Sequence, residues 1–290
     1  MQTDKKNILD TILDVKRGEV AAAKERRSQS SLESEAKQMP APRPFIERLR
    51  THSHPSIIAE VKRASPSKGV IREDLNPVET AKAYASAGAA CLSVLTDERF
   101  FQGNLDYLGE IKAAVPNIPL LRKDFTCDRY QVWETRVAQA DALLLIVAAL
   151  TPSELADLLS ESLKADLGVL IEVHTSEELE VALQAVNDAA SGVDPARYPL
   201  LGINNRDLKT FVTRLAVTRE ILEHGRSLAS RFPIGVDKLT VVAESGIKTG
   251  ADIQELTASG AKAFLIGESL LVSGDPGENL RQLIADSHDK

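Results

Sequence analysis

The sequence predicts a (β/α)8 barrel preceded by a helical N-terminal extension. Eight short apolar runs recur along the 290 residues, and polar segments with helical spacing separate them. The runs are continuously apolar rather than alternating, which is typical of parallel strands buried on both faces. Such barrels run to about 250 residues as one domain, so the chain is long enough for one. An open doubly wound sheet is the alternative, and the lack of a Gly-x-Gly-x-x-Gly after the first run disfavours it.

The N-terminal part, residues 1–44, is expected to stand apart from the barrel domain, which we assign to residues 45–290. Apolar residues at helical spacing predict one amphipathic helix over residues 6–27, with Asn7 as its N-cap. Residues 28–44 are rich in Ser, Glu and Gln and contain three prolines. We expect them to form an extended connector, because prolines interrupt regular elements.

Strands and helices then alternate along the barrel domain. The predicted strands are residues 57–61, 90–95, 119–121, 142–147, 169–173, 200–203, 240–243 and 263–266. The clearest helical patterns are residues 77–87, 104–115, 128–138, 152–164 and 176–186. Asn76, Thr151 and Thr175 precede three of these helices as N-caps, and a proline follows the first two at a position that suits it.

Composition excludes several classes of function. Asp and Glu outnumber Lys and Arg by 42 to 35, and a net charge of −7 argues against a nucleic-acid-binding surface. The longest apolar run, residues 142–150, is far shorter than the ~20 residues that span a membrane. The N-terminal residues are polar and partly acidic, unlike a signal or transit peptide. Two cysteines, Cys91 and Cys127, cannot build a disulfide framework, so we expect a cytoplasmic protein.

Ionisable side chains stand where the predicted strands end. Glu60 and Lys62 end the first strand, Lys123 follows the third, Glu172 is in the fifth and Glu244 follows the seventh. The carboxyl ends of barrel strands converge on the active site, and alternate strands contribute to one layer of side chains. One such residue alone could be an ordinary ion pair at a strand end. Together they predict a charged layer at the barrel mouth, because buried charges are costly unless paired.

Two glycines indicate a phosphate site. Gly246 follows the seventh predicted strand and Gly267 the eighth, the two places where barrels often bind phosphate through backbone N–H groups. Ser65, in the loop after the first strand, can add a hydroxyl donor. Each glycine alone could equally serve a plain turn.

An apolar wall is expected beside these groups. Phe101, Phe125 and Leu144 lie close to the second, third and fourth strands and could line a site for a ring, although core packing is the alternative. Cys127 has no histidine partner and is read as structural. The histidines lack the spacing of metal ligands, so we expect no metal site.

With these strand-end segments the sequence resembles the indole-3-glycerol phosphate synthase family of tryptophan biosynthesis. The resemblance covers residues 45–275 and the N-terminal helical extension. The segments that carry it are IIAEVKRASPSKG, SVLTDERFFQG, LLRKDF, ALLLIVAAL, LIEVHTSEEL, LGINNRDLKTF, VAESGI and FLIGESL. It implies closure of the indole ring of 1-(2-carboxyphenylamino)-1-deoxyribulose 5-phosphate, with release of carbon dioxide and water. It also implies that no cofactor is needed, since the aromatic amine supplies the electrons.

The resemblance further implies roles for the charged layer. Lys123 is similar to the general acid of the family, and apolar walls and neighbouring cations are expected to lower its pKa. Lys62 is similar to the cation that holds the substrate carboxylate. Glu172 is similar to the general base that removes a proton after decarboxylation. Glu60 and Asn204 are similar to the groups that order the sugar hydroxyls and the lysines.

Other positions match the substrate site of the family. Arg206, Glu244 and Ser245 match substrate-binding positions. Ser65, Gly246, Gly267 and Glu268 match the phosphate cradle. Glu268 replaces a serine found in some members, so only its backbone N–H carries over, and the carboxylate is expected either to point away from the phosphate or to lower the affinity for it. The segment 186–199 looks longer than in the shortest members of the family. We expect it to form an enlarged loop away from the reacting groups. The N-terminal helix is expected to cap the access of substrate to the site.

Three other functions fit parts of the pattern. A Schiff-base aldolase would use Lys123 as its nucleophile. A phosphoribosyl isomerase of the same pathway would need an acid and a base at the sugar but no cation for a benzoate. A barrel without activity could bind other tryptophan-pathway enzymes. A closed barrel has no exposed sheet edge that demands a partner, so we expect a monomer acting on a small phosphorylated molecule.

Overall fold

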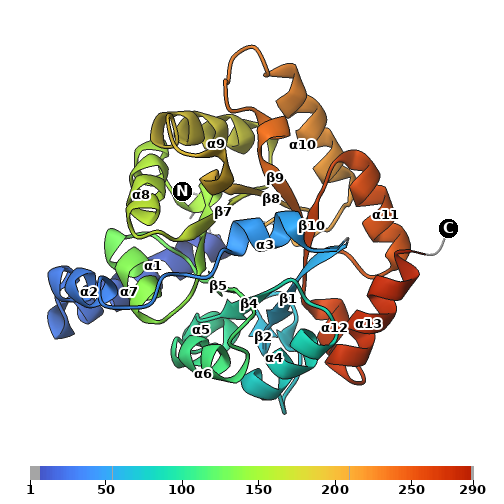
Figure 1. Cartoon of the computed structure of the whole chain (residues 1–290), viewed down its shortest axis with the longest axis horizontal. Helices are drawn as coiled ribbons and strands as arrows, with labels where there is room; N and C mark the ends of the chain where they lie inside the picture. The colour runs from blue at the N-terminus through green and yellow to red at the C-terminus, as the bar shows by residue number, and fades with distance from the viewer. Residues whose placement is uncertain (1–6, 54, 209, 289–290) are drawn as a thin grey trace, which may run out of the picture.

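The computed structural model describes residues 7–53, 55–208 and 210–288, and its centre is a closed barrel of eight parallel strands (Figure 1). Around the barrel the order is β1, β10, β9, β8, β7, β6, β5 and β4, with β4 pairing back onto β1. The strands are β1 Ser56–Val61, β4 Cys91–Leu95, β5 Leu120–Lys123, β6 Ala142–Ile146, β7 Gly168–Val173, β8 Leu200–Asn204, β9 Thr240–Glu244 and β10 Ala263–Ile266. The predicted fold class and all eight predicted strands are confirmed, and the open sheet is excluded.

Helices cover the outside of the barrel (Figure 1). Asn76, Thr151 and Thr175 cap their helices as predicted, because each side chain accepts a backbone N–H of the first turn. The helices that follow β1 are α4 Pro77–Ser86, α5 Glu98–Phe101, α6 Asp106–Ala114, α7 Arg129–Val137, α8 Pro152–Lys164, α9 Ser176–Ala189, α10 Ala216–Ser227, α11 Gly250–Ser259, α12 Glu268–Leu271 and α13 Pro276–Asp286. Short 3-10 turns are η1 Val147–Ala149, η2 Pro195–Arg197 and η3 Val236–Lys238.

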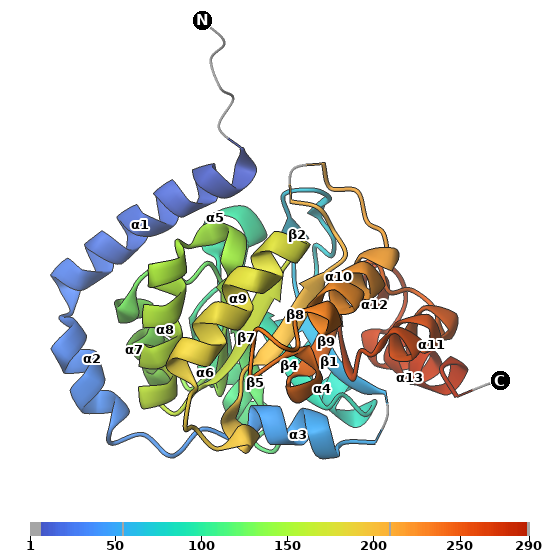
Figure 2. The ribbon, with the colours of Figure 1, turned by 90° about the horizontal axis from the view of Figure 1, so that it is seen from above.

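The N-terminal segment wraps the barrel from one end to the other. Helix α1, Ile8–Arg26, is the predicted helix, and the Asn7 side chain caps it by accepting the N–H of Asp10. Figure 2 shows α1 leaning over one end of the barrel, with helix α2, Gln29–Ala36, beside it and α3, Phe45–Thr51, across the opposite end.

The expectation of an irregular connector is wrong for residues 29–36, which form α2. Ser28 caps this helix by accepting the N–H of Ser31, and the prolines lie only beyond its last turn. Leu32 is buried in a small cluster with Val20 of α1 and Tyr130 of α7. Tertiary packing therefore outweighs the weak helical signal of this polar segment.

Helix α3 closes the end of the barrel that lies opposite the carboxyl ends of the strands. Phe45 and Leu49 are buried in the cluster that fills the barrel interior, together with Ile58 and Leu144. Arg50 donates to the backbone carbonyls of Pro195 and Ala196, at 3.1 Å each. Residues 195–196, at the end of the segment 186–199, therefore lie beside α3.

The loop after β1 carries a small antiparallel hairpin of β2, Ala64–Ser65, and β3, Gly69–Val70. This hairpin holds Ser65 beside the barrel mouth. Among the described residues, no helix is long and apolar enough to cross a membrane.

Candidate functional site

A cavity of about 910 Å³ opens at the carboxyl ends of the barrel strands. Every residue of the predicted site lines it: Glu60, Lys62, Ser65, Phe101, Lys123, Phe125, Leu144, Glu172, Asn204, Arg206, Glu244, Ser245, Gly246, Gly267 and Glu268. Helix α1 adds Ile8, Leu9 and Ile12 to the lining. The strand-end pattern in the sequence thus locates the cavity, and the roles of the residues remain to be argued from their contacts.

The predicted charged layer is present. Lys123 ends β5, and its Nζ atom lies 3.2 Å from Oε2 of Glu172 on β7 and 3.7 Å from Oε2 of Glu244 on β9. Both glutamate side chains are 2% exposed. One cation therefore lies among carboxylates from alternate strands, in a region almost closed to water.

The surroundings of Lys123 correct one expectation. Burial alone would lower the pKa of Lys123, but the negative charges of Glu172, Glu244 and Glu60 together raise it above its ordinary value. The predicted lowering by neighbouring cations is therefore wrong for this structure, because the nearest groups are acids. Lys123 is protonated, and so carries the proton that a general acid must give.

Three polar side chains contact the carboxylate of Glu172. Asn204 donates to its Oε1 at 3.1 Å, and Nε2 of His174 lies 3.2 Å from the same oxygen. Lys123 contacts Oε2. Burial alone would raise the pKa of Glu172, but Lys123 and His174 hold it well below its usual range. Glu172 is therefore a fixed, ionised carboxylate that can accept a proton.

Glu244 differs from Glu172 although the two lie close together. Burial and the neighbouring charge of Glu172 raise the pKa of Glu244 well above its ordinary value. Its carboxyl group therefore holds a proton more readily than that of Glu172. Gly202 of β8 leaves the space for it, since a β-carbon there would overlap Oε1 of Glu244.

Glu60 lies in β1 and Lys62 follows its last residue, and the two side chains form an ion pair. The Lys62 side chain is 16% exposed and Glu60 is more deeply buried, so the ammonium is the group that faces the cavity. Gly267 leaves the room for Glu60, because a β-carbon at Gly267 would come within 2.5 Å of its Oε2. Gly267 thus makes space for an acidic side chain beside the phosphate cradle.

Apolar side chains form one wall of the cavity. The rings of Phe101 and Phe125 have centroids 6.0 Å apart and are tilted by 42°. Leu144 is almost fully buried and belongs to the barrel interior as well as to the cavity lining. Ile12 of α1 lines the same cavity. A flat ring can therefore be held here away from water.

The predicted phosphate cradle combines strained backbone with cations. Ser245 and Gly246 have φ angles of 65° and 83°, and a β-carbon at Gly246 would overlap Thr213. Glycine is therefore required at this turn after β9. Its backbone lines the cavity, where an anion can approach closely.

Glu268 lies at this end of the cavity among basic side chains. Arg206 donates to its Oε2 at 2.9 Å, and Nζ of Lys68 lies 3.4 Å from its Oε1. Arg206 also donates to Oγ of Ser67 at 2.9 Å. Burial alone would raise the pKa of Glu268, but Arg206 and Lys68 lower it. The Glu268 carboxylate thus pairs with two basic side chains at this end of the cavity.

Sequence reasoning missed two groups beside the site. His174 has no metal-ligand spacing in the sequence, yet it lies between Glu172 and Glu178, whose Oε2 is 3.2 Å from Nδ1. The spacing of Glu172 and His174, two residues apart on one strand, could have shown that they share a face. Lys16 of α1 lies against Asp97 and Asp124, a contact between distant segments that no local pattern signals.

The sequence matches the indole-3-glycerol phosphate synthase family over residues 9–283. An indole-3-glycerol phosphate synthase from Acidithiobacillus ferrooxidans is 44% identical over 283 residues, which cover 97% of this chain and 99% of the relative. Another, from Azoarcus sp., is 45% identical over 280 residues, with 96% and 98% covered. The chain belongs to the indole-3-glycerol phosphate synthase family. An indole-3-glycerol phosphate synthase from Albidiferax ferrireducens is 42% identical over 282 residues, which cover 96% of this chain and 98% of the relative.

Solved structures of lower similarity share the barrel. A thiamine phosphate pyrophosphorylase from Pyrococcus furiosus has a TM-score of 0.56 at 15% identity, with 82% of this chain and 95% of that chain covered. The flavin-binding domain of yeast flavocytochrome b2 has a TM-score of 0.59 at 16% identity, covering 80% of this chain and 64% of that one. At these identities the likeness concerns the fold alone.

Membership of the indole-3-glycerol phosphate synthase family decides between the functions left open by the sequence. The chain is a carboxy-lyase of tryptophan biosynthesis that forms indole-3-glycerol phosphate, rather than an aldolase, an isomerase or a barrel without activity. A small phosphorylated substrate is consistent with this enzyme family.

Proposed function

We propose that Lys123 and Glu172 carry the proton transfers of ring closure in 1-(2-carboxyphenylamino)-1-deoxyribulose 5-phosphate. The observation that supports this pairing is a protonated lysine 3.2 Å from an ionised glutamate, both inside the cavity. An acid and a base with such different proton affinities can act at neighbouring atoms of one substrate.

The first step forms the carbon–carbon bond. The ring carbon that bears the carboxylate attacks the ketone carbon of the ribulose, and the electron pair of the carbonyl moves to its oxygen. Lys123 gives that oxygen a proton as the bond forms. Loss of carbon dioxide then returns the electron pair of the C–carboxylate bond to the ring and restores its aromaticity.

The second step removes water. Glu172 takes a proton from the carbon next to the ring nitrogen, and the new hydroxyl group leaves as water with a proton from an acid. The carbon–carbon double bond of the indole forms between the carbon that loses the proton and the carbon that loses the hydroxyl group. The sum is one molecule of carbon dioxide and one of water, and no cofactor takes part because the aromatic amine supplies the electrons.

The remaining residues orient the substrate in this proposal. Lys62 exchanges its contact with Glu60 for the substrate carboxylate, and the ammonium suits this as a point charge. Phe101, Phe125 and Leu144 hold the aromatic ring. The cavity lining that they share with Ile8, Leu9 and Ile12 supports a pose with the ring under α1.

The sugar and phosphate lie at the other end of the cavity. Asn204, Glu244 and Ser245 face the sugar hydroxyls. The backbone at Gly246 and Gly267, the hydroxyl of Ser65 and the N–H groups near Glu268 receive the phosphate, assisted by Arg206. These contacts are made before and after the reaction and so contribute mainly to substrate binding.

A fluorescence assay for indole formation tests the proposal directly. The purified protein with the anilino-ribulose phosphate is expected to give indole-3-glycerol phosphate and carbon dioxide in equal amounts. Product without decarboxylation, or a turnover that requires an added cofactor, would contradict the proposed steps.

We further propose that residues 1–44 act as a unit that covers the site of the barrel domain, residues 45–290. Ile8, Leu9 and Ile12 of α1 line the cavity, which supports this role. Deleting residues 1–40 is expected to raise KM and lower stability. An unchanged KM and Tm would leave the segment without this function.

The enzyme is proposed to work as a cytoplasmic monomer. The barrel is closed, so its eight strands leave no sheet edge for pairing with a second copy. The net charge of −7 disfavours nucleic acid as a partner. Light scattering after gel filtration, alone and with other tryptophan-pathway enzymes, tests both the oligomeric state and contacts with those enzymes.

A further inference from the structure

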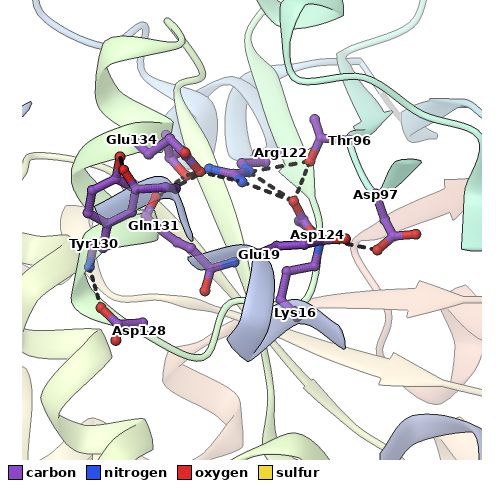
Figure 3. A network of polar contacts seen from close by, with 12 residues as sticks. Lys16, Glu19, Thr96, Asp97, Arg122, Asp124, Asp128, Tyr130, Gln131 and Glu134 are labelled. Carbon is purple, nitrogen blue, oxygen red and sulfur yellow. Dashed lines mark hydrogen bonds and ion pairs between the residues drawn. The ribbon is translucent and has the colours of Figure 1, made fainter. Parts of the chain in front are cut away.

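A buried ion-pair network joins α1 to the segments that follow β4 and β5. The Lys16 side chain is 6% exposed, and its Nζ atom lies 3.1 Å from Oδ2 of Asp97 and 3.0 Å from Oδ1 of Asp124. Glu19, one turn further along α1, lies 2.7 Å from the same atom. Figure 3 shows Lys16 reaching from α1 to both aspartates. Helix α1 is therefore fixed to the barrel by charges removed from water.

The acidic partners are themselves fixed from the barrel side. Arg122 of β5 contacts Oδ2 of Asp124 at 3.0 Å, and the hydroxyl of Thr96 donates to the same oxygen at 2.7 Å (Figure 3). Burial alone would raise the pKa of Asp124, but Arg122 and Lys16 hold it well below its usual range. Burial alone would lower the pKa of Lys16, but Asp124, Glu19 and Asp97 raise it. The contact is thus ionic over the whole working range of pH.

Both aspartates adjoin residues of the cavity. Asp124 directly follows Lys123. Asp97 caps α5 by accepting the N–H of Phe100 at 2.7 Å, and Phe101 at the end of α5 lines the cavity. On α1 itself, Ile12 lies one turn before Lys16 and lines the cavity too. Lys16 therefore links three parts of the site. It lies on the covering helix α1, contacts Asp97 at the start of the helix that carries Phe101, and contacts Asp124 next to the proposed acid Lys123.

We propose that Lys16 is a positioning residue for ring closure, which aligns the first turns of the docked helix α1 with Phe101 and Lys123 through Asp97 and Asp124. The inference rests on the proposed role of Lys123. Removing the cation would leave buried carboxylates short of a partner, and they would move toward water. Such a movement shifts the segments that carry the aromatic ring site and the acid.

A pair of lysine variants separates positioning from mere attachment. Lys24 also joins α1 to the barrel, with Nζ 2.7 Å from Oδ2 of Asp128, but its side chain is 42% exposed. Lys16→Met is expected to lower kcat and raise KM, reducing kcat/KM by about 10- to 100-fold, as for a displacement of about 1 Å. The kcat/KM of Lys24→Met is expected to stay within about twofold of the wild type, because exposed ion pairs contribute little. Unchanged kcat and KM in Lys16→Met, whatever its Tm, would overturn the proposal.

The single tryptophan of the chain reports whether α1 stays in place. Trp133 of α7 packs against the cluster that contains Val20 of α1. In Lys16→Met its emission maximum is expected to stay close to that of the wild type, because Val20 and Leu32 remain packed. A loss of activity with α1 still docked then shows local misplacement. A shift to the emission of a solvent-exposed tryptophan would instead mean wholesale release of α1 and contradict positioning by Lys16.

A double variant removes the uncompensated charge. In Lys16→Met with Asp97→Asn, the asparagine keeps the N-cap of α5 but carries no charge. Tm is expected to recover while kcat stays low, since the link from α1 to β5 is still missing. Recovery of both would assign Lys16 to charge compensation alone and overturn the proposal. Lys123→Met tests the proposed acid separately, so failure of one assignment is distinguishable from failure of the other.

Discussion

Lys123 and Glu172 face each other inside the barrel mouth, with 3.2 Å between Nζ and Oε2. The lysine holds a proton and the glutamate lacks one, and each stabilises the charge of the other. In the proposed reaction they act as an acid and a base held side by side at the barrel mouth. The following predictions test this pair and its surroundings.

Lys123→Met is expected to lower turnover by at least ~10²-fold, the low end for the loss of a general acid. The methionine keeps the length of the side chain, so circular dichroism should match the wild type. Near-wild-type turnover would contradict the assignment of Lys123. A covalent adduct at Lys123 after borohydride treatment with a sugar phosphate would also contradict it, since a Schiff base makes the lysine a nucleophile.

His174 makes stability depend on pH. Burial alone would lower its pKa, but its contacts with Glu172 and Glu178 raise it from 6.5 to about 10. A raised pKa stabilises the folded state fully below pH 6.5, and this contribution is lost as the pH rises through about 10. As the pH rises from 6.5 to about 10, the Tm of His174→Gln should therefore fall less than the Tm of the wild type.

Glu178→Gln is the matched control for His174, because it removes one carboxylate and leaves Glu172 in place. The fall of its Tm over the same pH range should lie between that of the wild type and that of His174→Gln. Parallel curves for all three proteins would mean that the histidine is neutral in the folded state.

Gly202→Ala is expected to disturb Glu244, because the added methyl group overlaps Oε1 of that side chain. The variant should lose about tenfold in kcat/KM through misplacement of the carboxyl group. Overpacking should cost about 1–3 kcal/mol of stability in urea unfolding.

Gly18→Ala serves as the control for Gly202→Ala. Gly18 is exposed in the middle of α1 and has open space around its Cα. Alanine should stabilise the protein there by about 0.5–1 kcal/mol and leave kcat unchanged. Wild-type kinetics in Gly202→Ala would show that Glu244 adjusts without cost.

Glu268→Gln is expected to strengthen the binding of inorganic phosphate by about two- to fivefold, the range for removing one partly exposed ion pair. The reason is that Arg206 and Lys68 no longer have the carboxylate as a partner. Competitive inhibition of indole formation by phosphate measures the effect, with Glu268→Asp as the charged control. Weaker inhibition in Glu268→Gln would mean that Glu268 orients Arg206 for the phosphate.

The barrel could be predicted from the sequence because its signals are local. Each strand is a continuous apolar run, and caps such as Asn76 and Thr151 mark where helices begin. Site residues such as Lys123 and Glu172 could be found because polar groups interrupt apolar strands at a known end. The pKa of Lys123 could not be predicted, because it depends on which charges of other strands lie nearest.

Helix α2 and the contacts of Lys16 escaped prediction for the same reason. Leu32 is buried only because Val20 and Tyr130 lie against it, and a polar segment gives no sign of such a partner. Asp97 and Asp124 are far from Lys16 in the chain. Contacts of this kind follow from the assembled fold rather than from spacing along the sequence.

The N-terminal segment takes its ionic partners from one early stretch of the chain. Lys16 pairs with Asp97 and Asp124, Lys24 with Asp128, and Arg43 with Asp141. A growing polypeptide has made all of these groups before β7 to β10 leave the ribosome. The first half of the chain therefore contains every partner of these ion pairs. The last strand to be synthesised, β10, has only to pair with β9 and β1 to close the barrel.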